Sequence, residues 1–264
     1  FVMNSLLFKN KYGYFTPDGK EYVIFNPITP RPWVNVICNG DYGTVVSQLG
    51  SGYSWRTHAS LNRLTRWEQD LVKDEWGKYL YIRDNDAGQF WSAGYKPTNV
   101  KPDLYECRHG IGYTSITSQV QNIRTEHTVF VPVGEPLEVW VLKIKNLSNQ
   151  KRNLGLFTYL EWSLGEGPDS HREFHKTFIE TDYLESFDMI TAKKRLWTVP
   201  NKKGQHWNTD WPYLGFHSSS ESVTSFTCDK ESFIGLYRNL QHPAALEQPM
   251  LSRAKGKWND SIAS

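Results

Sequence analysis

The sequence predicts an all-β protein whose strands form one large antiparallel sandwich. Segments of alternating apolar and polar residues recur along the 264-residue chain at a spacing of about 8–14 residues, as in sandwich domains. Between them lie turn-forming residues, among them 19 Gly and 13 Pro. The 11 Trp, 14 Tyr and 13 Phe, which favour strands, make up 14% of the chain. Together, these three observations leave little of the chain for helices.

The first 120 residues contain a series of segments with the two-residue period of a half-buried strand. Most are bounded by Gly, Pro, Asn or Asp, which supply turns. The strands expected here cover residues 21–25, 33–38, 43–48, 78–83, 89–92, 104–109 and 112–118.

The middle of the chain predicts an antiparallel meander of three strands, at residues 121–131, 137–145 and 154–162. In the first strand Ile123, Thr125, His127 and Val129 fall on one face. The second strand carries apolar residues on both faces, which indicates partial burial on each side. Short turns connect the three strands, so neighbours in sequence are expected to pair antiparallel.

The last third predicts further strands at residues 174–181, 187–197, 213–218 and 223–228. One helical pattern stands out, at residues 229–237. Asp229 is suited to cap its N-terminus, and Glu231 falls in its first turn. We therefore expect only a few short helices.

The composition sets the domain organisation and excludes several function classes. No linker or repeat interrupts the pattern, so we expect one domain over residues 13–264 after an N-terminal extension at residues 1–12. A net charge of +2 gives no reason to expect a nucleic-acid partner. No apolar stretch approaches the roughly 18 residues of a membrane span, so no membrane partner is expected. Cys38, Cys107 and Cys228 lack a Cys-x-x-Cys spacing, which indicates reduced thiols in a cytoplasmic protein and no metal site.

A glycine-flanked loop is the first candidate for ligand contact. An aromatic ring in such a loop can stack on a sugar face while Arg and His donate hydrogen bonds to sugar hydroxyls. The same pattern fits an ordinary hairpin whose aromatic residues pack in the core, and spacing alone does not separate the two. The candidate substrate-binding residues of the loop are Tyr53, Ser54, Trp55, Arg56 and His58.

A second candidate is Arg172, which lies between His171 and His175 in a polar segment. The segment does not have the zinc-protease order, because Glu173 stands third rather than second. We interpret it as an extended loop in which Arg172 contacts a ligand or a neighbouring domain. No catalytic residue is identified, since the carboxylates are scattered and nucleophile-elbow, phosphate-loop and dinucleotide motifs are missing.

Several motifs, taken in order along the chain, resemble one enzyme family. They include KYGYF at 11–15, PRPWVN at 30–35, YLYIRD at 79–84, YECRHG at 105–110 and SFIGLY at 232–237. Nearly the whole chain resembles the N-terminal domain of the inverting disaccharide phosphorylases of glycoside hydrolase family 94, formerly glycosyltransferase family 36. This group comprises cellobiose, chitobiose, laminaribiose and cellodextrin phosphorylases.

The resemblance implies a fold, a reaction and partners. The fold is a large antiparallel β-supersandwich of the galactose-mutarotase type, which in the family precedes a helical linker and a catalytic (α/α)6 barrel, usually in a homodimer. The family cleaves β-linked gluco-disaccharides or oligosaccharides, with inorganic phosphate as co-substrate and no other cofactor, and inverts the anomeric carbon to give a sugar 1-phosphate. The general acid and the phosphate site belong to the barrel. We therefore expect this chain to shape the acceptor site and the dimer interface without being catalytic alone.

The resemblance also implies roles for the two candidate segments. The loop matching Gly52, Tyr53 and Ser54 reaches the partner subunit's active site in the family, and the arginine matching Arg172 approaches the acceptor sugar. This chain departs from the family pattern after Ser54, where Trp55, Arg56, Thr57 and His58 follow, and around Arg172. The acceptor is therefore expected to differ from that of cellobiose phosphorylases.

Two other functions remain open from the sequence. A stand-alone carbohydrate-binding module would bind glucose oligomers without any other domain. A mutarotase-type enzyme would need two His and a Glu in one cleft, for which His109, His127 and His175 are the candidates. No motif brings these histidines together.

Overall fold

The computed structural model describes residues 6–68, 70–166, 176–196, 210–256 and 261–264. The chain forms two compact units, which are described separately below. Unit 1 contains Phe1–Tyr53 and Trp67–Leu156, and unit 2 contains Ser54–Arg66 and Phe157–Ser264.

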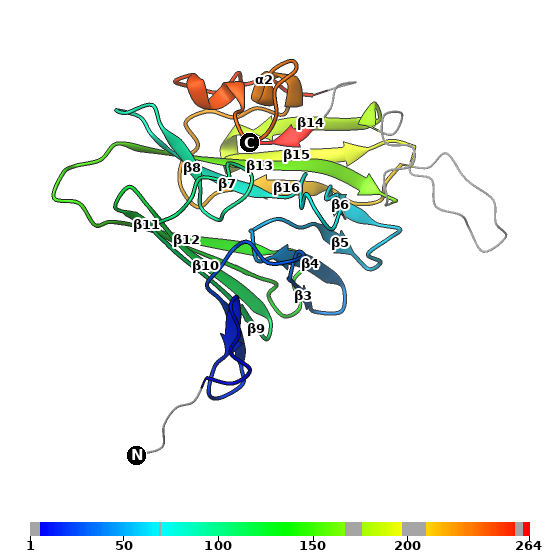
Figure 1. Cartoon of the computed structure of the whole chain (residues 1–264). Helices are drawn as coiled ribbons and strands as arrows, with labels where there is room; N and C mark the ends of the chain where they lie inside the picture. Colours follow the sequence, from blue (N-terminus) through cyan, green and yellow to red (C-terminus); the bar gives the residue numbers. More distant parts are fainter. Residues whose placement is uncertain (1–5, 69, 167–175, 197–209, 257–260) are drawn as a thin grey trace. The chain divides into compact units, whose positions relative to one another are not determined.

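Unit 1 is built on a six-stranded sheet in the order β1-β2-β9-β10-β11-β12. Every neighbouring pair in this sheet is antiparallel (Figure 1). The strands are β1 (Gly13–Phe15), β2 (Glu21–Ile24), β9 (Leu104–Gly110), β10 (Tyr113–Val120), β11 (Ile123–Phe130) and β12 (Val139–Asn146).

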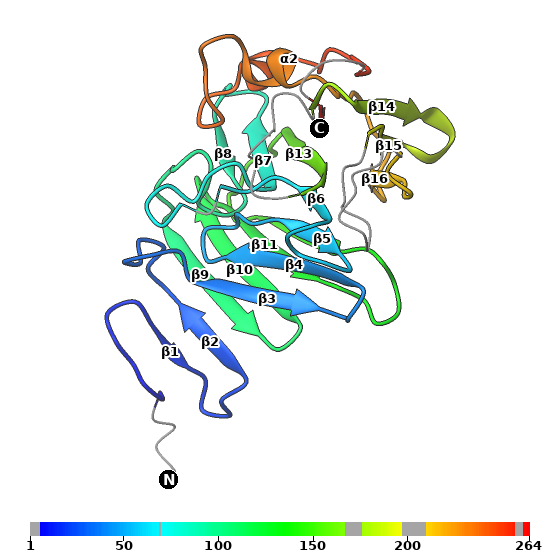
Figure 2. The same cartoon turned by 90° about the vertical axis from the view of Figure 1, so that its right-hand side faces the viewer.

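Strict alternation in the sequence gives this sheet one buried face. In β10 and β11 every second residue is buried, so that Ile116 and Val129 point inward while their neighbours lie nearer the surface. Two hairpins of unit 1 pack on the buried face and complete its core. They are β3 (Val34–Cys38) with β4 (Tyr42–Ser47), and β7 (Tyr79–Asp84) with β8 (Phe90–Ser92) (Figure 2).

Unit 2 contains shorter strands and the helices. The strand β13 (Leu154–Gly165) begins in unit 1 and continues into unit 2. In unit 2 it pairs with β6 at Trp162 and Gly165 and with β17 at Leu160 and Glu161. The other elements are β5 (Ser54–Arg56), β6 (Arg63–Thr65), β14 (Ile179–Leu184), β15 (Met189–Lys194), β16 (Gly215–Ser218), β17 (Ile262–Ala263), the helix α2 (Lys230–Ile234) and the 3₁₀ turns η1 (Glu185–Phe187) and η2 (Ala244–Glu247).

The core of unit 2 lies between β13 and the antiparallel sheet β14-β15-β16. Trp162 and Leu164 of β13 pack with Ile179 and Ile190 of that sheet, and all four are buried. No helix in the described part of the chain is long and apolar enough to cross a membrane.

The predicted fold class is confirmed, and most predicted strands lie where the alternation placed them. Two predictions at the C-terminal end are wrong. Residues 223–228 form no strand, because Thr227 and Cys228 bond to backbone groups of Ser264 and Ala254 outside any ladder. The helix predicted at 229–237 ends at Ile234, since Gly235 adopts a φ of 88°.

Other differences concern the ends of strands and short strands that were not predicted. The strand predicted at 187–197 begins at Met189 instead, because the η1 turn occupies the preceding residues. The strand predicted at 174–181 begins at Ile179 in the described part of the chain. The strands β1, β5, β6 and β17 have two or three residues each, too few to show a period. The expectation of a single domain stays a prediction.

Candidate functional site

The loop that precedes the candidate residues needs glycine at two positions. Gly50 and Gly52 have φ angles of 87° and 145°, in the region that residues with a side chain rarely adopt. A Cβ atom at Gly52 would lie 1.8 Å from the carbonyl oxygen of Val45. This close approach lets the Val45 N–H donate to the carbonyl oxygen of Tyr53 at 2.9 Å. The glycines therefore bring the loop back against β4.

Tyr53 ends this loop with its ring inside unit 1. Only 6% of its surface is exposed, and its ring stacks on Trp67 with a centroid distance of 5.8 Å and an interplanar angle of 19°. Such stacking adds about 0.5–1.5 kcal/mol beyond the burial of apolar area. In the described chain, the Tyr53 ring therefore packs against Trp67.

The next residues enter unit 2 as the β5–β6 hairpin. Ser54 is fully buried, and its N–H donates to Thr65 Oγ1 at 2.9 Å. Trp55 lies opposite Arg63 in the ladder and is 8% exposed. The first two residues of β5 thus anchor the hairpin in the protein interior.

Arg56 lies at the base of the hairpin tip, on an aromatic support. Its guanidinium carbon lies 4.4 Å from the centroid of the Tyr213 ring, which fits a cation–π contact. Tyr213 meets Trp211 edge to face at 5.2 Å, and Trp211 Nε1 donates to Asn62 Oδ1 at 2.8 Å. The residues that fix Arg56 therefore come from both ends of unit 2.

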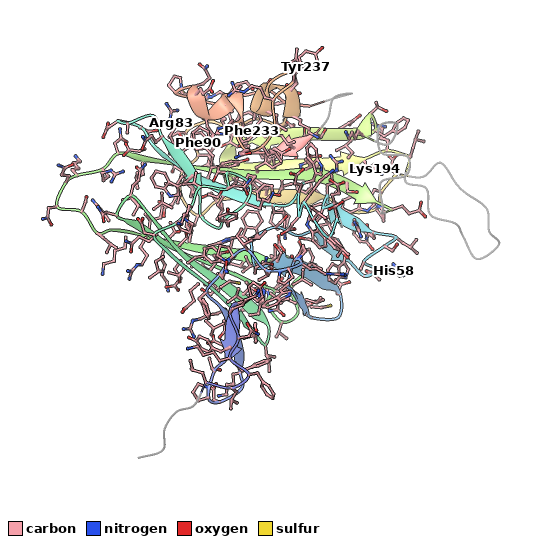
Figure 3. The ribbon with its side chains drawn as sticks, viewed as in Figure 1. His58, Arg83, Phe90, Lys194, Phe233 and Tyr237 are labelled. Carbon is pink, nitrogen blue, oxygen red and sulfur yellow. The ribbon has the colours of Figure 1, made fainter. Side chains whose placement is uncertain are left out.

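His58 lies exposed at the hairpin tip (Figure 3). Its Nδ1 accepts hydrogen bonds from the backbone N–H groups of Ser60 and Leu61, at 3.2 and 3.1 Å. A ring nitrogen that accepts carries no proton, so this network assigns the hydrogen of the neutral imidazole to Nε2. His58 therefore offers a fixed hydrogen-bond donor at the surface of unit 2.

The structure places the predicted site residues in two environments. Tyr53, Ser54 and Trp55 are buried, whereas Arg56 is half-buried and His58 is exposed. Arg172 lies outside the described residues, as do His171 and His175. The assignment of these residues to sugar binding stays a prediction. Chemically, the hairpin tip can donate hydrogen bonds to a polar ligand through its guanidinium and imidazole groups.

Sequence reasoning missed the residues that support the loop and the hairpin. Trp67, Trp211 and Tyr213 hold Tyr53 and Arg56, yet they lie far from the loop in sequence or outside its motif. The only available signal was the high aromatic content, which does not say which rings pair. Asn62, which bonds to Trp211, lies outside every predicted strand.

Two of the three histidines considered for a mutarotase-type site, His109 and His127, lie on strands of unit 1. Burial lowers the pKa of His109 and that of His127 to about 4, so both are neutral at neutral pH. His109 bonds to Thr114 Oγ1 at 2.9 Å and to the carbonyl oxygen of Trp33 at 3.1 Å. Among the described residues, no group of three or more His, Cys, Asp or Glu side chains could hold a metal ion.

Comparison with known proteins assigns the chain to a domain type. The family model of the glycosyl hydrolase 94 supersandwich domain matches residues 20–264. The chain is 32% identical to N,N'-diacetylchitobiose phosphorylase of Vibrio proteolyticus, over 92% of this chain and 30% of that protein. It is 31% identical to 3-O-beta-D-glucopyranosyl-beta-D-glucuronide phosphorylase of Paenibacillus borealis, over 96% of this chain and 30% of that protein.

A further relative is named for a different reaction. The chain is 30% identical to the cyclic beta-(1,2)-glucan synthase NdvB of Rhizobium meliloti, over 92% of this chain and 8% of that protein. The chain thus spans about a third of the length of the two phosphorylases and a small part of the synthase. All three matches cover nearly all of the present chain.

Proposed function

Because the chain belongs to the glycosyl hydrolase 94 supersandwich domain family, we propose that it is the N-terminal domain of a carbohydrate phosphorylase. The complete enzyme would cleave β-linked gluco-disaccharides or oligosaccharides with inorganic phosphate and release a sugar 1-phosphate with inversion. The observation that carries this proposal is the match of residues 20–264 to the family, together with two phosphorylases among the relatives.

The reaction divides between this domain and a catalytic (α/α)6 barrel. A phosphate oxygen attacks the anomeric carbon, the glycosidic bond breaks, and the departing oxygen takes a proton from a general acid. We assign the phosphate site and the acid to the barrel and assign part of the acceptor site to this domain. Inorganic phosphate is then the co-substrate, and the domain alone is not catalytic.

Within this domain, the hairpin tip is the part suited to contact the acceptor. Sugar hydroxyls accept hydrogen bonds from Arg and from a neutral imidazole N–H. Arg56 is held over Tyr213 and His58 has its Nδ1 occupied, so both side chains have defined positions. Ser54 and Trp55 would anchor the hairpin that carries them, and Tyr53 and Arg172 would contribute from their own segments.

Phosphorolysis by the complete protein tests the proposal. The coding sequence that continues beyond this domain would be expressed, and release of sugar 1-phosphate from β-linked disaccharides would be measured with and without phosphate. We expect phosphate-dependent release by the complete protein and none by residues 1–264. Release by the short chain would contradict the division of labour, and no release by either would contradict the proposed reaction.

The glucan synthase among the relatives provides a second candidate function. The same type of domain occurs in a protein named for synthesis rather than phosphorolysis, at an identity close to that of the phosphorylases. Glucan synthesis by the complete protein from an activated sugar would favour this second function. Calorimetric titration of the short chain with glucose oligomers separates both from a stand-alone binding module, because only the module should bind alone.

The proposal extends to assembly and location. We place the complete enzyme in the cytoplasm as a homodimer, with this domain at the interface, in keeping with the three free cysteines. Light scattering on the complete protein should give twice the monomer mass. A monomer that is fully active would contradict this part of the proposal.

A further inference from the structure

A buried carboxylate lies beneath the loop that carries Tyr53. Asp74 is 1% exposed and lies in the segment of unit 1 that leads to β7. Its Oδ2 accepts a hydrogen bond from Ser47 Oγ at 2.6 Å, and its Oδ1 accepts one from Trp67 Nε1 at 2.7 Å. Hydrogen bonds to a carboxylate are stronger than those between neutral groups. Each donor in turn contacts a different part of the loop.

Through Ser47, Asp74 orders the backbone of the loop. A hydroxyl has a single hydrogen, and Ser47 gives it to Asp74. The Ser47 oxygen is then free to accept, and it receives the backbone N–H groups of Leu49 and Ser51, each at 3.2 Å. The carboxylate therefore sets the direction of the hydroxyl that holds two backbone amides of the loop.

Through Trp67, Asp74 orders the aromatic end of the same loop. The Trp67 indole has a single donor, its Nε1–H. The hydrogen bond from this group to Asp74 fixes the rotation of the ring. The same ring also stacks on Tyr53, with a distance of 5.8 Å between the ring centroids. One carboxylate thus links the start of the loop at Leu49 to its end at Tyr53.

The segment that carries Asp74 is strained and packs tightly against the loop. Asp74 and Trp76 have φ angles of 48° and 61°, in the left-handed region that residues with a side chain rarely adopt. At Gly77 a Cβ atom would lie 2.2 Å from Ser51 Oγ and 2.8 Å from the Gly52 nitrogen. Such strain persists only where the surroundings fix the backbone, and it concentrates at functional sites.

A purely stabilising role would not require a charge at this place. Burial raises the pKa of Asp74, and the hydrogen bonds of Ser47, Trp67 and Ser51 oppose that shift. Removing a carboxylate from water is costly, and well-packed apolar residues are often at least as stabilising as a buried charge. What the carboxylate provides is a fixed geometry for donors that belong to the loop or contact it.

We propose that Asp74 is a positioning residue for saccharide binding, which fixes residues 49–53 and, with them, the candidate binding residue Tyr53. This inference rests on the proposed function, because only that function places a saccharide at this segment. Asp74 acts through Ser47 and Trp67 and does not itself contact the sugar.

The first test measures the order of the loop in the chain of residues 1–264. In Asp74→Asn, amide hydrogen exchange at Leu49 and Ser51 should be at least tenfold faster, while exchange within β10 and β11 stays unchanged. Asp84→Asn is the matched control, because Asp84 is a buried carboxylate of unit 1 that bonds to Arg152 and not to the loop or its supports. It should leave exchange at Leu49 and Ser51 unchanged. Unchanged exchange in Asp74→Asn would overturn the inference.

The second test measures kinetics in the complete phosphorylase. Asp74→Asn should raise the KM for the saccharide about fivefold or more, with the KM for phosphate unchanged and kcat within twofold. If Asp74→Asn does not fold, Trp67→Phe and Ser47→Ala each remove one of its donors and should give smaller shifts in the same KM. Trp67→Phe keeps an aromatic ring for the stack on Tyr53 and loses the N–H together with the five-membered part of the indole.

The outcomes distinguish failure of the positioning role of Asp74 from failure of the proposed phosphorylase function. An active wild-type enzyme whose saccharide KM is unchanged by these variants would overturn the positioning role alone. Equal increases in both KM values would do the same, because they indicate general loosening of the fold. A wild-type protein without phosphorolysis would overturn the proposed function and this role with it.

Discussion

At the scale of single residues, His58 shows how backbone contacts determine what a side chain can offer. Its Nδ1 closes the turn at the hairpin tip by accepting from Ser60 and Leu61. The same contacts leave Nε2–H as its outward donor. The side chain therefore has a structural role and a proposed binding role on two different atoms, and substitution can separate them.

Two substitutions of His58 should differ in stability. His58→Ala removes both accepted bonds and should lower the free energy of unfolding by about 1 kcal/mol. His58→Asn should be nearly neutral, because the Asn Oδ1 can accept from the same backbone groups. Urea denaturation of the two variants measures the difference. Equal stability would show that the Nδ1 contacts do not hold the turn.

Gly52 is predicted to tolerate no side chain. Gly52→Ala would place a Cβ atom against the Val45 carbonyl oxygen at a φ of 145° and should cost more than about 3 kcal/mol. Gly40→Ala is the control, since Gly40 has a φ of 101° with open space around its Cβ position and should cost about 1 kcal/mol. Thermal unfolding of both variants tests this, and similar losses would contradict the steric argument.

His127 should make the protein less stable in acid. Its folded pKa is about 4 against an ordinary value of 6.5, because of burial and the nearby Lys78 charge. Between these values the unfolded state binds a proton that the folded state does not, so stability falls as the pH decreases from about 6.5 to about 4. From pH 7 to pH 5 this histidine should account for roughly 2 kcal/mol.

The variant His127→Phe isolates that contribution. Its free energy of unfolding should change less between pH 7 and pH 5 than that of the wild type. Some pH dependence should remain, because His109 also has a folded pKa of about 4 and contributes a similar loss of stability. Urea titrations at the two pH values give both numbers. An unchanged pH dependence would show that His127 is protonated in the folded protein.

At the scale of elements, one buried carboxylate joins three segments of unit 2. Glu161 of β13 is fully buried, and it accepts bonds from Arg66, at 3.2 Å, and from Lys230 at the start of α2, at 2.9 Å. The Tyr159 hydroxyl donates to it at 2.8 Å. Glu161 thus connects β13, the residue after β6, and α2.

Removal of this charge should loosen all three segments. Glu161→Gln leaves two cations without their carboxylate and should cost about 3–5 kcal/mol. Glu126→Gln is the matched surface control, because the exposed Glu126–Lys143 pair at 2.9 Å is worth less than about 1 kcal/mol. Urea denaturation measures both. A loss below about 1 kcal/mol for Glu161→Gln would contradict the connecting role.

The sequence predicted the long strands well because their burial follows a simple alternation. In β10 and β11 every second residue is inward, and the pattern reads directly as a strand. The two-residue strand β17 and the three-residue β5 have no period, since their position depends on β13 and β6. Residues 223–228 have the right composition for a strand, but only their last two residues bond to the backbone of residues 262–264, which gives no strand in the described structure.

The candidate site was predictable only in part. The sequence pointed to its glycines, to Arg56 and to His58, because glycines mark a loop and Arg and His side chains can donate hydrogen bonds to sugar hydroxyls. The burial of Tyr53 against Trp67 and the support of Arg56 by Tyr213 were not, since both depend on contacts between distant parts of the chain. Asp74 carried no signal, because an isolated Asp between predicted strands is ordinary in sequence.

At the scale of the whole molecule, the chain corresponds to one domain of longer proteins. Both units devote their interiors to apolar packing and to satisfied polar groups, as at Asp74 and Glu161. The donors proposed to meet a ligand lie on a short hairpin tip. The two phosphorylases among the relatives are about three times longer than this chain. We therefore propose that this domain contributes to recognition and that bond cleavage belongs to another part of the complete protein.

The acceptor KM of His58→Asn in the complete protein tests this account most directly. The reaction would be run in the synthetic direction, with the sugar 1-phosphate and the acceptor sugar varied separately. Because the variant keeps the turn and loses Nε2–H, we predict at least a tenfold higher KM for the acceptor with the KM for sugar 1-phosphate unchanged. An acceptor KM equal to that of the wild type would contradict the assignment of the hairpin to the acceptor site.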